Sequence, residues 1–73
     1  MINVTVFQKA EIYSARQELR RLLDLLDAAH DPVFRSEVQL ELAKALRLIQ
    51  PVYTITRDGE LERLLVKAEQ HFT

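Results

Sequence analysis

The chain has 73 residues, no cysteine, and a formal net charge of −1 that results from ten basic and eleven acidic residues. This length suffices for one domain and not for two, and the lack of cysteine excludes disulfides and cysteine-ligated zinc as sources of stability. Basic and acidic residues are mixed evenly along the sequence, so no segment has the basic composition typical of phosphate binding. We expect one small helical domain, residues 1–73, stabilised by a tight core or by self-association.

The first residues of the chain have a strand-like pattern. Ile2, Val4 and Val6 are β-branched, and the two residues between them are polar. Such alternation predicts a short strand over residues 2–6, and a loose terminal arm is the alternative.

A first helix is predicted from a position between Phe7 and Glu11 to about Ala29. Its apolar side chains recur at steps of three and four residues, which is the spacing of one helical face. This seam consists of Ile12, Ala15, Leu19, Leu22, Leu26 and Ala29. Leu23 and Leu25 flank the seam on opposite sides, so we expect that more than one neighbour is needed to cover it.

The residues His30, Asp31 and Pro32 mark a break between two helices. Asp31 suits the N-cap, and Pro32 suits the first helical position, where its missing N–H has no consequence. A second helix is predicted from Pro32 to Ile49 or Gln50. Its main apolar stripe consists of Phe34, Val38, Leu42, Ala45 and Ile49. Because the connection is very short, we expect the two helices to form an antiparallel hairpin.

Pro51 is expected to end or kink the second helix, since the residue before a proline disfavours helical dihedral angles. The next five residues, 52–56, are all β-branched or aromatic, which favours a strand. Residues 2–6 are the natural partner of such a strand. The alternative is an extended linker or the irregular start of the next helix.

A third helix is predicted from about Gly59 to His71, with Asp58 as its N-cap. Its apolar face consists of Leu61, Leu64, Leu65, Ala68 and Phe72. These elements predict an all-α fold, a small three-helix arrangement built on the hairpin and dimeric. The alternative is an α+β fold in which residues 2–6 and 52–56 pair as short strands. The residues expected to form the packing or the interface are Ile12, Leu19, Leu22, Leu25, Leu26, Val38, Leu42, Ile49, Leu61 and Leu65.

The sequence contains no motif typical of catalysis, cofactor binding or metal binding. A single glycine excludes a glycine-rich phosphate loop, and Ser14 and Ser36 lie outside any nucleophile motif. His30 is expected to stabilise the carbonyl end of the first helix, and His71 is expected to lie on the surface. We therefore expect neither an enzyme nor a protein that holds a cofactor or a metal.

The charged residues predict ion pairs along the first helix and candidate contacts with a partner. Arg20 and Arg21 lie within four residues of Asp24, so weak ion pairs are expected along the first helix. The weak candidates for contact with a partner are Asp24, Asp27, Glu37 and Glu41. No stretch approaches the roughly 20 apolar residues of a membrane span, and the N-terminus lacks a signal-peptide pattern. We expect a cytoplasmic protein without membrane contact.

An excess of helix-packing surface in a short chain without a reaction centre predicts a small non-enzymatic protein–protein interaction module. An adaptor, an inhibitor or an immunity-type factor would fit, with a second copy and an unidentified protein as partners. The alternative is a dimeric nucleic-acid-binding regulator. That alternative requires six basic side chains to converge on one surface, namely Arg16, Arg20, Arg21, Arg35, Lys44 and Arg47.

Overall fold

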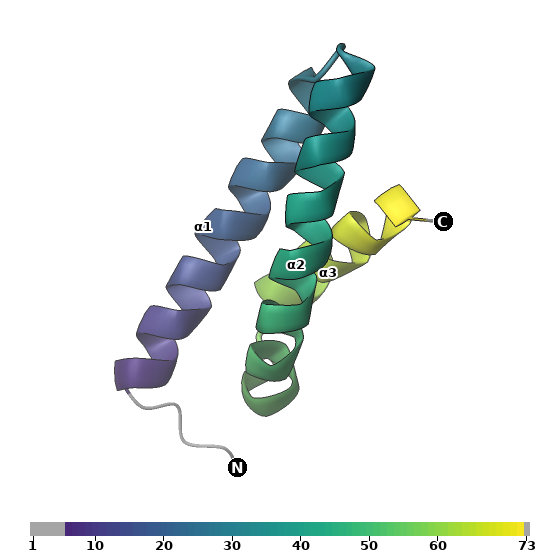
Figure 1. Cartoon of the computed structure of the whole chain (residues 1–73). Coiled ribbons are helices and arrows are strands. Elements are labelled where there is room, and N and C mark those ends of the chain that lie inside the picture. Colours follow the sequence, from purple (N-terminus) through teal and green to yellow (C-terminus); the bar gives the residue numbers. More distant parts are fainter. Residues whose placement is uncertain (1–5, 73) are drawn as a thin grey trace.

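The structure, a computed structural model, describes residues 6–72 (Figure 1). Over that range the chain forms the α-helices α1 (Val6–Ala28), α2 (Pro32–Thr56) and α3 (Gly59–Glu69) and the 3-10 helix η1 (Gln70–Phe72). The chain reverses direction between α1 and α2, which lie side by side, and α3 packs against both (Figure 1). The predicted all-α class is confirmed for the described residues. The strand predicted for residues 2–6 lies outside them except for Val6, which is already helical.

The short connection between α1 and α2 is closed by polar contacts at both helix ends. The carboxylate of Asp31 accepts a hydrogen bond from the backbone N–H of Phe34 at 2.9 Å, so Asp31 is the predicted N-cap. Pro32 occupies the first helical position behind it. The guanidinium of Arg35 donates to the carbonyl oxygen of Leu26 at 2.8 Å, which satisfies an acceptor in the last turn of α1.

The predicted end of the second helix at Gln50 is wrong, because α2 continues through Pro51 to Thr56. The strand predicted for residues 52–56 is therefore wrong, and so is the α+β alternative that depended on it. A proline inside a helix costs about 3 kcal/mol, since it removes one backbone hydrogen bond and crowds the preceding turn. Val52 and Tyr53 beyond it are half-buried against the core, and such burial contributes on the order of 1–2 kcal/mol for each side chain.

Two hydroxyl groups donate hydrogen bonds within this last stretch of α2, and a residue with a left-handed backbone conformation ends it. The hydroxyl of Thr54 donates to the carbonyl oxygen of Gln50 at 3.0 Å, and that of Thr56 donates to the carbonyl oxygen of Val52 at 2.7 Å. Arg57 then adopts a left-handed conformation with φ of 53° and terminates the helix. Tertiary packing and these local bonds together outweigh the β-propensity of the segment.

The third helix begins as predicted and ends slightly earlier. The carboxylate of Asp58 accepts a hydrogen bond from the backbone N–H of Leu61 at 2.9 Å, which confirms it as the N-cap. The α-helix ends at Glu69 and not at His71, because the last three described residues tighten into η1. Such tightening is common in the last turn of a helix.

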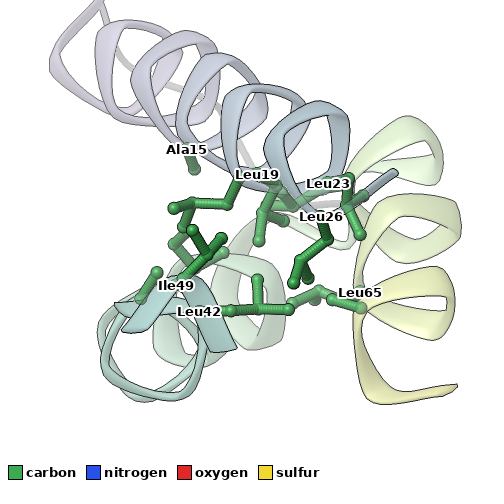
Figure 2. Packing of buried hydrophobic residues seen from close by; sticks show 12 residues of the cluster. Ala15, Leu19, Leu23, Leu26, Leu42, Ile49 and Leu65 are labelled. Carbon is green, nitrogen blue, oxygen red and sulfur yellow. The ribbon is translucent and has the colours of Figure 1, made fainter. Parts of the chain in front are cut away.

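The core lies between the three helices and consists of aliphatic side chains. Its fully buried members are Leu19, Leu22, Leu26, Leu42 and Leu61. Figure 2 shows Leu65 on the side of α3, whereas Ala15 and Ile49 lie at the opposite edge of the cluster. Phe34, expected in the main stripe of α2, lies in the first turn of that helix and is 42% exposed.

Candidate binding surface

The layer formed by α1 and α2 has two unlike sides. One side is covered by α3, whose residues Leu61, Leu65 and Ala68 are buried against it. The other side contains a groove of about 610 Å³ between α1 and α2. Its lining consists of Ala10, Glu11, Ser14, Ala15, Glu18, Glu41, Lys44, Ala45, Leu48, Ile49 and Val52. No residue of α3 contributes to this lining.

We call this side the open face of the molecule. Helical periodicity extends the open face from the groove toward the loop. Arg21 and Leu25 follow Ser14 and Glu18 by seven residues, about two helical turns, so they lie on the same side of α1. Phe34 precedes Glu41 by the same interval on α2. The open face thus comprises the groove lining together with Arg21, Leu25 and Phe34.

The groove combines small residues with one prominent large side chain. Ala10, Ser14, Ala15 and Ala45 project little from their helices, so the space between α1 and α2 stays unfilled there. Leu48 lies beside this space and is 76% exposed, more than any other large hydrophobic side chain among residues 8–72. Leu48 and the apolar residues of the groove form one contiguous patch, and such patches are typical of protein contact surfaces.

The charges of the open face form local pairs of opposite sign. The guanidinium of Arg21 donates to Glu18 at 2.6 and 3.3 Å, and the ammonium of Lys44 lies 3.7 Å from Glu41. The hydrogen bond and the charge of Glu18 raise the pKa of Arg21, and the negative charge of Glu41 adds to this effect. Both charged pairs therefore lie close together across the groove.

The covered side carries a different cluster, which attaches the start of α3 to α1. The guanidinium of Arg16 donates to both carboxylate oxygens of Asp58, with 3.0 Å between Nε and Oδ2. It also lies 3.3 Å from Glu60, which forms a further ion pair with Arg20. The hydrogen bond from Arg16 lowers the pKa of Asp58, although partial burial of the carboxyl group acts in the opposite direction.

This cluster was missed by the sequence analysis, which paired Arg20 and Arg21 with Asp24. Helical spacing considers only neighbours along one helix, whereas Arg20 finds Glu60 on α3. One signal was available. Asp58 and Glu60 concentrate negative charge at the start of α3, and Arg16 and Arg20 repeat at four residues on α1.

The residues predicted for packing or interface lie mainly inside the molecule. Nine of the ten are buried, and Leu25 is half-buried at the edge of the core. The four acidic candidates are all exposed and are not gathered at one place. Glu41 lines the groove, Glu37 lines a shallower hollow on the outer side of α2, and Asp24 and Asp27 line neither.

The six basic residues are likewise dispersed. Arg16 and Arg20 pair with residues of α3 on the covered side, whereas Arg21 and Lys44 form their ion pairs on the open face. Arg35 is bonded to a backbone carbonyl at the loop, and Arg47 is exposed on α2. The groove lining contains one hydroxyl, that of Ser14, and no histidine. Within residues 6–72, no cluster of three His, Asp or Glu side chains is arranged to hold a metal ion.

Comparison with protein-family models, with curated proteins and with solved structures finds no significant match to this chain. No helix within the described part of the chain has the length and apolar character needed to cross a membrane. The functional interpretation therefore depends on the geometry of the open face.

Proposed function

We propose that this protein is a small non-enzymatic protein–protein interaction module that acts through helix packing on its open face. The observation that carries the proposal is Leu48, which is 76% exposed beside an apolar groove of about 610 Å³. The antiparallel hairpin of α1 and α2 is the scaffold in this proposal. An adaptor, an inhibitor or an immunity-type factor would each act through such a surface in this proposal.

The shape of the groove favours a helix as its occupant. A groove between two helices accepts a third helix whose side chains at positions i, i+3, i+4 and i+7 fill it. The lining combines the apolar side chains of Leu48, Ile49 and Val52 with charged residues, as protein interfaces combine apolar and polar groups. The occupant would cover Leu48 and Val52 and exclude water from the alanines beneath them.

Nucleic acid is a less favoured partner for this face. Its cations are Arg21 and Lys44, and both are paired with carboxylates. Phosphate binding uses Lys and Arg side chains that neutralise phosphates and displace counterions from the nucleic acid, and a carboxylate already paired with the cation competes with the phosphate. On the covered side, Arg16 and Arg20 are occupied by Asp58 and Glu60.

The proposal is tested by comparing two substitutions of the same type on the same helix. Leu48→Glu places a charge on the open face, whereas Leu40→Glu places it in the hollow on the outer side of α2. Both leucines are exposed, so both variants are expected to fold. A protein captured by the wild type would be purified and titrated against all three chains by calorimetry.

We expect the affinity to fall more than tenfold for Leu48→Glu and to change less than threefold for Leu40→Glu. Loss of an anchoring apolar side chain together with burial of a charge accounts for such a decrease. Equal binding of all three chains would contradict the assignment of the open face.

A further inference from the structure

We infer that the occupant of the open face is a second copy of this chain, related by a two-fold axis that runs parallel to α1 and α2. The four helices of the two copies then share one core, and each α3 lies on the outside. This inference rests on the proposed function, because it names the partner of the same face. Shape, charge and area support it independently.

The open face carries both a projection and the space that could receive it. Leu48 projects from α2, and the small residues Ala10 and Ser14 leave a space on α1. In a two-fold dimer the same patch of both copies forms the interface, so a projection and a space on one face are filled at the same time. A face with this property is self-complementary in shape.

The levels of the residues along the helices determine which two-fold axis fits. The chain reverses at the loop, so residues equally far from it on α1 and α2 lie at similar levels (Figure 1). The charge of Glu41 acts on Arg21, so these two residues lie near one level, and Glu18 and Lys44, each three residues further from the loop, lie near the next. An axis parallel to the helices preserves these levels and places α2 of one copy opposite α1 of the other. Leu48 then faces the space beside the partner's Ser14.

The same operation brings opposite charges together. Lys44 comes opposite the partner's Glu18, and Glu41 comes opposite the partner's Arg21, because the two members of each pair lie near the same level. The other possible axis lies in the interface perpendicular to the helices and sets α1 against the partner's α1. With that axis at the middle of the groove, Glu11 comes toward the partner's Glu18, because both residues line the groove on α1, and two carboxylates would oppose each other.

The size of the face matches that of a stable dimer. The described chain has Cα extents of 44 × 21 × 16 Å, so the outline of a long face of the molecule measures roughly 700 to 900 Å². Standard interfaces bury about 800 Å² for each partner. At the loop end, Phe34 and the half-buried Leu25 extend the apolar area and would meet the same pair of the partner.

Solution mass is the first test. We expect light scattering behind size exclusion to give twice the chain mass of 8.5 kDa for the wild type and for Leu40→Glu. Leu48→Glu is expected to give the single-chain mass with unchanged helical circular dichroism. A wild type that is monomeric at all concentrations up to about 1 mM would overturn the inference.

Cross-linking tests the direction of the axis, and the absence of cysteine makes it direct. The Ser14→Cys and Leu48→Cys variants are mixed and oxidised mildly, and the disulfide-linked species are identified by mass. Neither variant can form a disulfide within its own chain. We expect the mixed species, Cys at 14 joined to Cys at 48, to dominate over both homogeneous species. Dominance of the homogeneous species would overturn the proposed axis.

Failure of this inference is distinguishable from failure of the proposed function. A monomeric wild type that still binds another purified protein through Leu48 would refute the dimer and leave the interaction module intact. A monomeric wild type whose binding is unaffected by Leu48→Glu would refute both.

Discussion

The two sides of the α1–α2 layer differ in what covers their apolar residues. On the covered side, α3 buries Leu61, Leu65 and Ala68 and is joined to α1 by Arg16 and Asp58. On the open side, the wide arc of apolar and small residues ends in a groove with Leu48 at its edge. The covered side determines whether the chain folds, and we propose that the open side determines what it binds.

The largest expected effect is on the covered side. Leu61→Asp places an unpaired charge at a position that is 0% exposed, which costs more than about 4 kcal/mol and unfolds the protein. Val66→Asp introduces the same group at an exposed position of the same helix and is the matched control. Circular dichroism at 25 °C should show loss of helix for the first variant alone. A folded Leu61→Asp variant would show that α3 is not essential to the core.

The next effect concerns the two N-caps. Asp31→Ala removes a capping hydrogen bond and is expected to lower the free energy of unfolding by about 1 kcal/mol. Asp58→Ala removes a cap and also the contact with Arg16, so a decrease of about 2 kcal/mol is expected. Urea unfolding of both variants measures the difference. Equal decreases would mean that the Arg16 contact adds nothing to the attachment of α3.

The pH dependence of stability isolates the same contact. The hydrogen bond from Arg16 lowers the pKa of Asp58 in the folded state, so the unfolded chain binds a proton more readily. The stabilisation is complete above the unfolded pKa of about 3.9 and is lost as the pH falls through the folded value. Urea unfolding at pH 6 and pH 3 should therefore show a larger loss for the wild type than for Asp58→Asn. Identical losses would contradict this role of Asp58.

The smallest effect is expected on the open side. In the Leu48→Glu background, which we expect to be monomeric, Arg21→Gln removes an exposed ion pair with Glu18. Such pairs contribute between about 0 and 0.5 kcal/mol, so the free energy of unfolding should hardly change. Arg16→Gln in the same background is expected to cost more, because Arg16 joins two helices. Urea midpoints compare the two, and the reverse order would contradict the distinction between the sides.

Local sequence patterns by themselves determined the helices and two of their boundaries. The spacing from Ile12 to Leu26 predicts α1 because apolar side chains three and four residues apart share one face. Asp31 and Asp58 predict the starts of α2 and α3 because a carboxylate satisfies free N–H groups wherever a helix begins. These features depend on nearest neighbours along the chain, and a sequence displays such neighbours directly.

Only the tertiary structure decided whether residues 52–56 form a strand or a helix. It also decided which of the two leucines that flank the α1 seam is buried. Val52 and Tyr53 become helical because the core beside them offers burial, which no propensity scale contains. Leu23 is buried and Leu25 only half-buried, although the two are equivalent in the sequence pattern. Likewise, Leu48 marks the open face only once α3 has packed against the opposite side. The physical reason is that burial depends on residues distant in the chain, and folding alone brings them together.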